Sequence, residues 1–352
     1  MTAPLRVLVV DDSPTARTLL SEILSADTSL SVVGQAADGV EAIELTKRLR
    51  PSIVVMDINM PGMDGFEATK RIMIEQPTPI VIVTAAYDSG EVEISLQAVR
   101  AGALTATRKP PGPMAPSFEA DAARLVRLVK ALAVVKLVRH TQRTPAAARV
   151  RATGDADENR RSVGVVGVAA STGGPAALYR FLEVLPRTLD IPVLVVQHIA
   201  EGFVTGLARW LGTATVLPVS VAEDGKEPRA GEVYIAPDGR HLGIRGGRLE
   251  LSSTAPVGGF RPSANVLFSS LADSRGPEAA AVVLTGMGND GLEGAARLRA
   301  AGGLVLAQDA DSSVVFGMPR AVTEAGLAHG VGNPDDLAYR IARFGSKKGE
   351  CR

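Results

Sequence analysis

Three carboxylates, a hydroxyl and a lysine follow successive apolar segments in the first third of the 352-residue chain. Asp11 and Asp12 come directly after one apolar run, and Asp57 comes after a later one. Clustered carboxylates repel one another unless a cation neutralises them, and oxygen ligands with room for water suit Mg²⁺. Thr84 and Lys109 follow two further runs and could hold phosphoryl oxygens. An Asp-Asp pair alone is common at helix starts, but the full set predicts a magnesium-dependent phosphoryl site.

A serine, a histidine and an aspartate in the second half of the chain are the residue types of a hydrolytic triad. Ser171 begins Ser-Thr-Gly-Gly-Pro, which taken alone could equally be a simple cap before a helix. His198 directly follows an apolar run, and Asp290 lies in the glycine-rich segment Thr285–Gly291, which lacks the Lys-Ser/Thr ending of a P-loop. Serine needs a base, histidine titrates near neutrality, and a carboxylate fixes its tautomer. A triad is therefore the hypothesis, provided that the fold brings the three residues together.

The edge of a parallel sheet would bring the residues of the first site together. Short apolar runs alternate with helical patterns, which predicts an α/β fold with a doubly wound parallel sheet. Ligands in such sheets bind beyond the carboxyl ends of the strands, where the acidic residues fall. The expected strands are Leu5–Val10, Leu30–Gln35, Ile53–Met56, Ile80–Val83 and Gly102–Thr107.

A second alternation of the same kind begins at Val163 and predicts a second doubly wound sheet. Gly246-Gly247 between short alternating runs predicts a β-hairpin over residues 241–251. The expected strands are Val163–Val168, Val193–Val196, Val233–Ile235, Ala281–Leu284 and Leu304–Ala307, and the expected helices are Ala176–Val184, Val204–Leu211, Ser263–Ala272 and Leu292–Ala300.

Between the two alternations the pattern changes. Phe118–Arg139 is a helical stretch whose basic polar face we interpret as a solvated surface. From His140 to Arg161 the sequence is polar and rich in Ala and Arg, which is typical of a linker. We expect a first domain over residues 1–125, a helical and flexible linker over 126–161, and a second domain over 162–345.

Composition excludes several classes of protein. Lys+Arg and Asp+Glu are balanced at 38 each and aromatic residues make up 4%, so neither nucleic-acid binding nor a stacking platform is expected. The single cysteine, Cys351, cannot form an internal disulfide or a zinc cluster. No apolar run approaches the roughly 20 residues of a membrane span, and Met1–Val10 lacks the apolar stretch of a signal peptide. A cytoplasmic protein without direct membrane insertion is expected.

The first of these patterns resembles a known domain. Residues 5–110 resemble a response-regulator receiver domain of flavodoxin-like fold, and the motifs that carry the resemblance are Val9–Ser13, Met56–Gly65, Thr84 and Lys109-Pro110. The resemblance implies that a histidine kinase phosphorylates Asp57. It also implies that Asp11, Asp12 and Asp57 hold Mg²⁺, and that Thr84 and Lys109 contact the phosphoryl group.

One position departs from the receiver pattern. Receivers commonly carry an aromatic residue three positions before the lysine, and an Asp just before that aromatic. This chain has Ala106 and Thr105 there. We therefore expect phosphorylation to act on the second domain by another route or with weak coupling.

The chain as a whole resembles the chemotaxis protein-glutamate methylesterase family, in which a receiver is joined to a serine esterase. The matching motifs of the second half are Ala170–Pro175, Gln197-His198, Tyr234–Pro237, Arg261–Ser263, Val266–Phe268, Thr285–Gly291 and Gly317–Pro319. The resemblance implies hydrolysis of glutamyl methyl esters on chemoreceptors, with glutamine deamidation by the same chemistry. It also implies a kinase of the CheA type as phosphodonor, no cofactor for the esterase step, and a monomer.

The roles of individual residues also come from this resemblance. It makes Ser171 the nucleophile, His198 the general base and Asp290 its orienter. Thr172 would support the site, and the backbone N–H of Met287 would help to stabilise the oxyanion. Many relatives carry Asp where this chain has Asn265, and we expect a local effect there, near the substrate groove.

Two alternatives stay open at the level of sequence. The receiver could act as a phosphate sink or docking unit joined to a vestigial hydrolase. The same enzyme could instead serve a chemosensory pathway that does not control motility. In the favoured interpretation, the unphosphorylated receiver covers the substrate groove and phosphorylation of Asp57 uncovers it.

Overall fold

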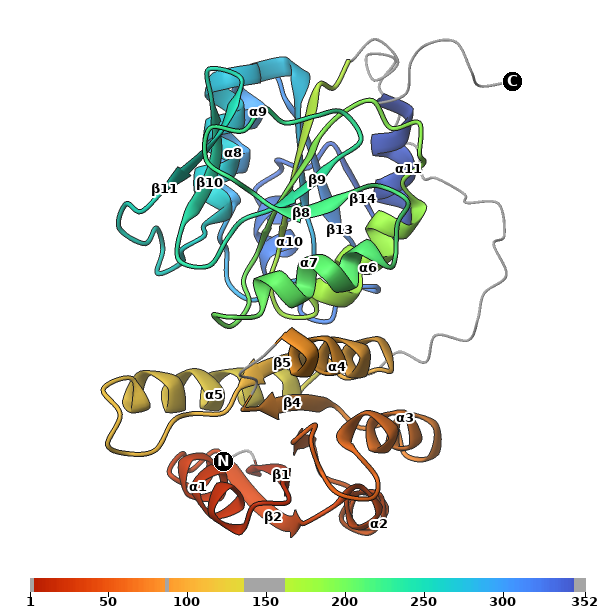
Figure 1. The fold of residues 1–352 in the computed structure, drawn as a ribbon, viewed down its shortest axis with the longest axis vertical. Coiled ribbons are helices and arrows are strands. Elements are labelled where there is room, and N and C mark those ends of the chain that lie inside the picture. Colours follow the sequence, from red (N-terminus) through yellow and green to blue (C-terminus); the bar gives the residue numbers. More distant parts are fainter. Residues whose placement is uncertain (1–2, 86–88, 136–161, 345–352) are drawn as a thin grey trace. The chain divides into compact units, whose positions relative to one another are not determined.

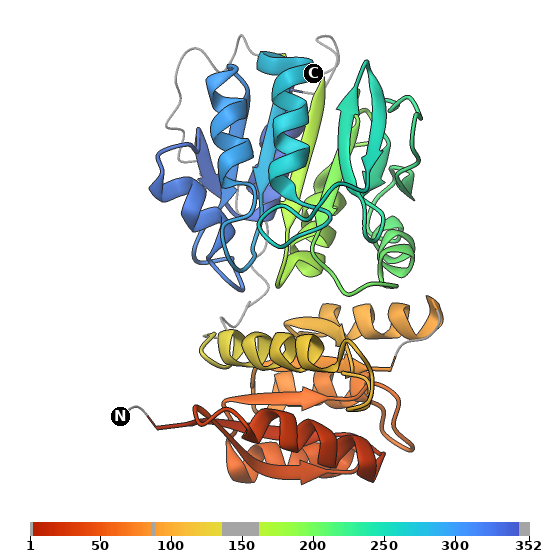
Figure 2. The same cartoon turned by 90° about the vertical axis from the view of Figure 1, so that its left-hand side faces the viewer.

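The structure is a computed structural model that describes residues 3–85, 89–135 and 162–344, with the backbone alone for 89–94 (Figure 1). The chain divides into two compact units, Met1–Arg139 and His140–Arg352. Each unit is a sheet with helices on both faces, which confirms the expected α/β class and its two doubly wound parallel sheets (Figures 1 and 2).

The first unit is a five-stranded parallel sheet in the order β2-β1-β3-β4-β5. Helices α1 and α5 pack on one face of this sheet, and α2, α3 and α4 pack on the other. The strands are β1 (Leu5–Val10), β2 (Leu30–Ala36), β3 (Ile53–Met56), β4 (Ile80–Thr84) and β5 (Thr105–Arg108), and the helices are α1 (Pro14–Ser25), α2 (Gly39–Leu49), α3 (Gly65–Glu75), α4 (Ser89–Arg100) and α5 (Phe118–Ala133). The fifth strand starts later than expected, because a turn at Gly102 with φ 124° precedes it.

Helix α5 belongs to the first unit along its whole length. Its buried side chains Leu125, Val129 and Leu132 lie on the face that packs on α1 and β3. Lys130 Nζ lies 2.9 Å from Asp27 Oδ2, beyond the end of α1. The domain boundary expected at residue 125 therefore falls inside this helix. Most of the expected linker, residues 136–161, lies outside the described residues.

The second unit is a seven-stranded parallel sheet in the order β14-β13-β12-β6-β7-β9-β8. Its strands are β6 (Val165–Ala170), β7 (Val193–Gln197), β8 (Val219–Val221), β9 (Val233–Ile235), β12 (Ala279–Val283), β13 (Leu304–Gln308) and β14 (Gly330–Gly332). The edge strands β8 and β14 were not expected, because three residues are too few to make a recognisable apolar run. The central strands β6, β7 and β12 are buried along their whole length.

Helices cover both faces of this second sheet (Figure 2). One face carries α6 (Gly174–Val184), α7 (Val204–Gly212) and α11 (Pro334–Phe344), and the other carries α8 (Ala264–Arg275), α9 (Leu292–Ala300) and α10 (Met318–Glu324). The predicted hairpin is confirmed as β10 (His241–Arg245) and β11 (Arg248–Ser252), and it packs against α8. Gly246 and Gly247 both have positive φ, as a two-residue type I′ turn requires.

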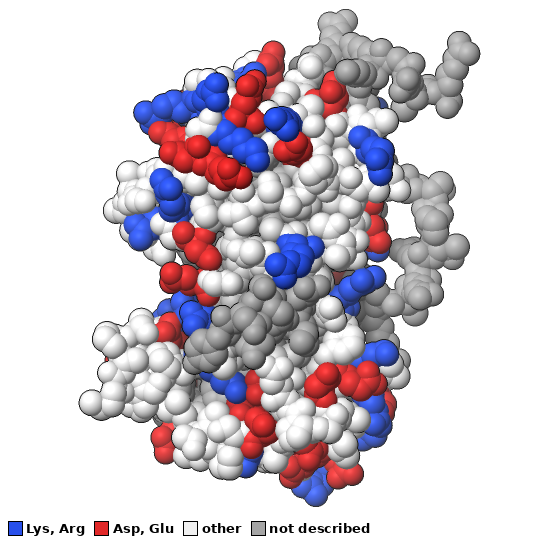
Figure 3. All heavy atoms as spheres, in the orientation of Figure 1, with Lys and Arg blue, Asp and Glu red and all other residues white. Residues whose placement is uncertain are grey.

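The surface agrees with the balanced composition. On the face drawn in Figure 3, acidic and basic side chains are interspersed and do not gather into a patch of one sign. None of the described helices is long and apolar enough to cross a membrane.

Candidate functional site

The acidic residues of the first unit meet at the carboxyl ends of two neighbouring strands. Asp11 and Asp12 follow β1 and Asp57 follows β3, and these strands are paired in the sheet. One carboxylate oxygen from each residue lies within 4.8 Å of the other two. Asp11 and Asp57 are buried and Asp12 is exposed, so the cluster opens to solvent on one side. An oxygen-only donor set with an open side suits Mg²⁺, which keeps several of its waters.

Lys109 bridges the two buried carboxylates. Its Nζ lies 2.7 Å from Asp11 Oδ2 and 3.0 Å from Asp57 Oδ2. Burial raises the pKa of Asp57 to about 6, although the nearby Lys109 charge opposes this rise. Burial lowers the pKa of Lys109, but its bonds and attraction to Asp11 and Asp57 outweigh burial and leave the pKa raised. The lysine therefore stays charged and offsets part of the repulsion between the two carboxylates.

Two further positions singled out by the receiver resemblance lie on the strands β4 and β5. Thr84 is buried at the end of β4, and its carbonyl oxygen accepts a hydrogen bond from the Lys109 N–H at 2.8 Å. Ala106 is buried in β5 opposite Ile82, so only a methyl group occupies the position where receivers commonly have an aromatic ring. Tyr87, which is close in sequence to Thr84, lies outside the described residues.

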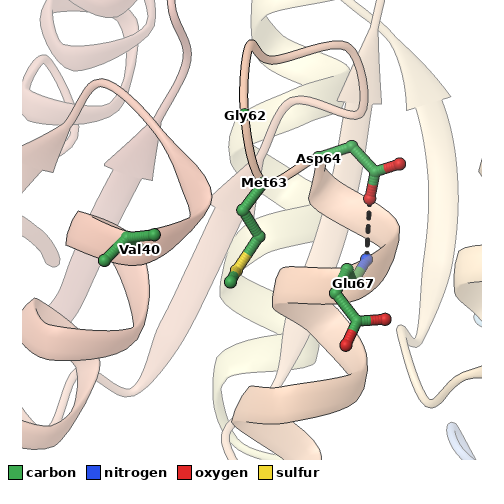
Figure 4. A pocket seen from close by; sticks show the side chains of 5 residues that line it. All are labelled: Val40, Gly62, Met63, Asp64 and Glu67. Carbon is green, nitrogen blue, oxygen red and sulfur yellow. Dashed lines mark hydrogen bonds between the residues drawn. The ribbon is translucent and has the colours of Figure 1, made fainter.

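A hollow of about 480 Å³ lies beside the loop that follows β3, but its lining offers no catalytic group (Figure 4). Its lining residues are Val40, Gly62, Met63, Asp64 and Glu67. Asp64 is the N-cap of α3 and accepts from the Glu67 N–H at 2.8 Å, so its carboxylate already has a structural partner. The lining offers no nucleophile or base comparable with those of the two candidate sites.

In the second unit, a sharp turn between β6 and α6 holds Ser171. The Ser171 N–H donates to Thr285 O at 3.0 Å, and Gly174 N–H donates back to Ser171 O at 2.8 Å. Gly173 has φ 77°, and a Cβ on Gly174 would lie 2.9 Å from Gln197 Cδ. Both positions therefore need glycine, the first for its backbone conformation and the second for close approach. The turn leaves Ser171 at the carboxyl edge of the sheet.

Gln197 joins the nucleophile turn to the histidine. Its amide nitrogen donates to both Ser171 O and His198 O, at 2.8 Å each. The His198 N–H in turn donates to Ala170 O at 2.9 Å. The residues that follow neighbouring strands β6 and β7 are thus fixed to each other by main-chain and side-chain bonds. The sequence placed Gln197 in a motif but gave no sign of this bridging role.

Asp290 receives hydrogen bonds from the His198 ring and from the N-terminus of α8. His198 Nε2 lies 2.9 Å from Asp290 Oδ2. The Ser263 hydroxyl donates to Oδ1 at 2.7 Å, and the Ala264 N–H donates to Oδ2 at 2.7 Å. The Asn265 and Gly291 N–H groups donate to Oδ1 at 3.1 and 3.0 Å. A helix N-terminus favours negative charge, so this arrangement is built for a carboxylate.

The charge state of Asp290 fixes the tautomer of His198. Burial raises the pKa of Asp290, but the hydrogen bonds from His198, Ala264 and Ser263 outweigh it and leave the pKa lowered. The ionised carboxylate can only accept, so Nε2 carries the ring proton and Nδ1 keeps its lone pair. Nδ1 is buried and has no hydrogen-bond partner in the described part of the chain. It is therefore free to accept a proton.

The loop after β12 approaches Ser171 closely. A Cβ on Gly286 would lie 2.7 Å from Ser171 Cβ, so this position also requires glycine. The next residue, Met287, is partly buried, and its N–H donates to no group among the described residues. Thr172 is buried, and its carbonyl oxygen accepts from Thr285 Oγ1 at 3.0 Å. The described residues show no hydrogen bond between Ser171 and His198, a contact that is often loose before substrate binds.

Two other positions have structural partners. Asn265 Oδ1 accepts from the Gly294 N–H at 2.9 Å, so this side chain links α8 to the start of α9. The expected local effect of Asn265 near a substrate groove stays a prediction. His241 is fully buried, and its Nδ1 accepts from the Ser263 N–H at 3.2 Å. His241 therefore supports the segment that carries Ser263.

These features define a class of protein: a response regulator whose receiver is joined to a second α/β unit with its own polar site. Residues 7–114 match the response regulator receiver domain family, and residues 166–341 match the CheB methylesterase family. The chain belongs to the family of protein-glutamate methylesterases/protein-glutamine glutaminases, and it is an enzyme of that family.

Similar proteins cover nearly the whole chain. Protein-glutamate methylesterase/protein-glutamine glutaminase 4 of Myxococcus xanthus is 56% identical over 340 residues, covering 96% of each chain. The corresponding protein 3 of Anaeromyxobacter dehalogenans is 54% identical, covering 96% of this chain and 98% of its own. The CheB methylesterase catalytic domain of Thermotoga maritima is 37% identical with a TM-score of 0.50, covering 51% of this chain and 98% of its own.

Proposed function

We propose that this protein is a phosphorylation-activated methylesterase that removes methyl groups from glutamyl esters of chemoreceptors and deamidates receptor glutamines. Ser171, His198 and Asp290 form its catalytic triad. The observation that carries the proposal is the His198 ring, which is bound to Asp290 at Nε2 and has a buried Nδ1 without a hydrogen-bond partner in the part of the chain that the structure describes. The strand that leads to this histidine is paired with the strand that leads to Ser171.

In the proposed mechanism each residue has one step. Ser171 Oγ attacks the ester carbonyl while His198 Nδ1 takes its proton, and Asp290 stabilises the imidazolium that forms. The N–H of Met287 stabilises the oxyanion of the tetrahedral intermediate, and Thr172 supports the turn. His198 returns the proton to the leaving methanol. A water molecule, activated by the same nitrogen, then releases glutamate and regenerates Ser171.

The first unit would control this reaction. A histidine kinase of the CheA type would supply the phosphoryl group to Asp57. Asp11, Asp12 and Asp57 would hold Mg²⁺, which offsets negative charge during phosphoryl transfer, while Lys109 and the Thr84 hydroxyl contact the phosphoryl oxygens. Phosphorylation would shift the population toward an enzyme with an uncovered groove. We place the reaction in the cytoplasm and propose that the protein works as a monomer.

The chemistry is tested by methanol release from a methylated receptor. Ser171→Ala should abolish release, because alanine has no nucleophile. Ser274→Ala, an exposed serine on α8, is the matched control and should keep the wild-type rate. Methanol release by Ser171→Ala at a near wild-type rate would refute the assignment of Ser171 as the nucleophile, whereas the absence of release by the wild type would favour a docking receiver with a vestigial hydrolase.

The regulation is tested separately with beryllofluoride, which mimics a phosphoryl group on aspartate. Beryllofluoride and Mg²⁺ should raise the rate of methanol release, and Asp57→Ala should remove the response. The basal rate of Asp57→Ala measures what the second unit does without the signal. An esterase that ignores both treatments would show that phosphorylation does not gate this enzyme.

A further inference from the structure

An aromatic ring lies flat against the candidate catalytic histidine. The rings of Phe260 and His198 are stacked, with centroids 4.1 Å apart and planes inclined by only 5°. The one polar contact of the His198 ring among the described residues is its bond to Asp290 at Nε2. That bond fixes the position of one edge of the ring but still allows the ring plane to tilt about the contact between Nε2 and Asp290 Oδ2. The stacked Phe260 ring restricts this tilt, so the two contacts together define where Nδ1 lies.

Phe260 is itself held by a tight turn. The N–H of Val257 donates to Phe260 O at 3.1 Å, and the N–H of Phe260 donates back to Val257 O at 3.0 Å. The two residues between them, Gly258 and Gly259, have φ of 60° and 86°. Positive φ at both central positions defines a type I′ turn, which glycine pairs adopt readily. The Phe260 side chain is partly buried, and the hydrogen-bonded turn holds its backbone in place.

The segment around the turn is anchored on both sides. Arg261 Nη1 donates to Ser253 O and Thr254 O at 3.2 Å each. His241 lies 3.2 Å from Ala255 O through Nε2, and its Nδ1 accepts from the Ser263 N–H at the same distance. Hydrogen bonds therefore hold the chain in place on both sides of the turn.

One short stretch of chain makes both contacts with the catalytic pair. Phe260 stacks on the imidazole, and three residues later the N-terminus of α8 begins to bind Asp290 through Ser263, Ala264 and Asn265. The plane of the base and the position of its orienting carboxylate thus depend on the same segment, residues 260–265. Any shift of this segment would move both together.

We propose that Phe260 is a positioning residue, which holds the His198 ring in the plane that aims Nδ1 at the Ser171 hydroxyl. This inference rests on the proposed triad and adds a residue to it. The ring face of Phe260 also lies against the imidazolium that forms when Nδ1 takes the proton, and aromatic faces attract cations. Loss of the ring should therefore slow the chemical step and leave substrate binding largely unchanged.

The test compares three substitutions in the full-length protein. Phe260→Leu keeps an apolar side chain without the ring, Phe260→Tyr keeps the ring, and Phe260→Ala removes both. We expect Leu and Ala to lower kcat for methanol release on the order of 10- to 100-fold with little change in KM, as small misplacements of catalytic groups do. Tyr should restore most of the rate. Labelling of Ser171 by a fluorophosphonate should slow in parallel, because it needs the same base but not the receptor.

Controls separate the stack from the turn and from the triad. Val257→Ala alters the paired residue of the same turn and should keep kcat, and thermal unfolding shows whether each variant is folded. If Phe260→Leu is folded and matches the wild type, or if Phe260→Tyr and Val257→Ala lose as much activity as Leu, the positioning role is overturned. If Phe260→Ala does not fold, the Leu and Tyr pair decides. Methanol release by Ser171→Ala would overturn the triad itself, whereas failure confined to Phe260 leaves the triad intact.

Discussion

Asp290 illustrates how much a single residue depends on its neighbours. Its carboxylate accepts hydrogen bonds from a serine hydroxyl, three backbone N–H groups and the His198 ring. Each backbone N–H can only donate, so each requires an acceptor at that position. The number of donors exceeds what is needed to orient one imidazole. Asp290 therefore has two tasks, since it both fixes the tautomer of His198 and holds α8 against the loop after β12.

Replacing this carboxylate by an amide should disturb both tasks. In Asp290→Asn an NH₂ group must face at least one donor, so kcat should fall by roughly a thousandfold or more through the wrong His198 tautomer. The free energy of unfolding should fall by about 1–3 kcal/mol, because a buried donor loses its acceptor. Asp311→Asn, an exposed acid in the same unit, should change neither quantity. Methanol-release kinetics and urea unfolding measure the two effects, and an unchanged kcat would exclude Asp290 as the orienter.

The lowered pKa of Asp290 also has a consequence for stability. A carboxyl group whose pKa is lower in the folded than in the unfolded state stabilises the fold above its unfolded pKa. That contribution is lost as the pH falls through the folded value. Asp290→Asn should therefore flatten part of the acid limb of the stability curve of the second unit, measured by unfolding at a series of acidic pH values.

At the scale of elements, the N-terminus of α8 connects folding to chemistry. Ser263 is the N-cap, and its Oγ accepts from the Asn265 N–H at 3.2 Å while donating to Asp290 Oδ1 at 2.7 Å. Most helix caps stabilise their own helix only. Here the cap also binds the carboxylate that we propose orients His198, so the start of the helix and the proposed active site form together.

Ser263→Ala should therefore have two effects where an ordinary cap has one. Loss of the cap should cost about 1 kcal/mol of folding stability, and kcat should fall as well because Asp290 loses a donor. Asn333→Ala is the matched control, since Asn333 Oδ1 accepts from the Asp336 N–H at 2.9 Å at the start of α11, far along the chain from the triad. It should lose comparable stability and keep kcat. Equal kcat in the two variants would confine Ser263 to capping.

At the scale of the whole molecule, two units with separate cores carry two separate sites. The acidic cluster lies entirely in the first unit, and the proposed triad lies entirely in the second. The single tryptophan of the chain, Trp210, is 2% exposed in α7. Its fluorescence therefore reports unfolding of the second unit, whereas circular dichroism reports both.

This difference allows Mg²⁺ binding to be assigned to one unit. A ligand at a hundred times its Kd stabilises the unit that binds it by about 2.7 kcal/mol. Mg²⁺ should raise the thermal midpoint of the dichroism transition and shift the Trp210 fluorescence transition much less, and chelation should reverse the effect. Asp12→Ala removes an exposed ligand and should abolish the shift, while Glu22→Ala, an exposed acid on α1, should retain it. A shift that survives Asp12→Ala would place the metal elsewhere.

The sequence by itself determined the class of fold and the order of its elements. Buried parallel strands are continuous apolar runs, so the runs at Ile53–Met56 and Val233–Ile235 appear as strands with the expected bounds. The glycine pair at 246–247 determined the hairpin for the same local reason. Residues placed directly after strands, such as Asp57 and His198, could be expected at the carboxyl edge because chain direction fixes that edge. The three-residue strands at the sheet edges carried no such signal.

Tertiary structure alone decided which groups meet. No local pattern shows that the cap of α8 binds a carboxylate 27 positions away, that Gln197 bridges two loops, or that Phe260 stacks on His198. These contacts join segments that are far apart in sequence, and they depend on how loops fold over the sheet edge. Nor does the residue pattern show which nitrogen of His198 faces Asp290, because that choice is made by the positions of donors and acceptors in space. Sequence supplied the chemical groups, and packing supplied their orientation.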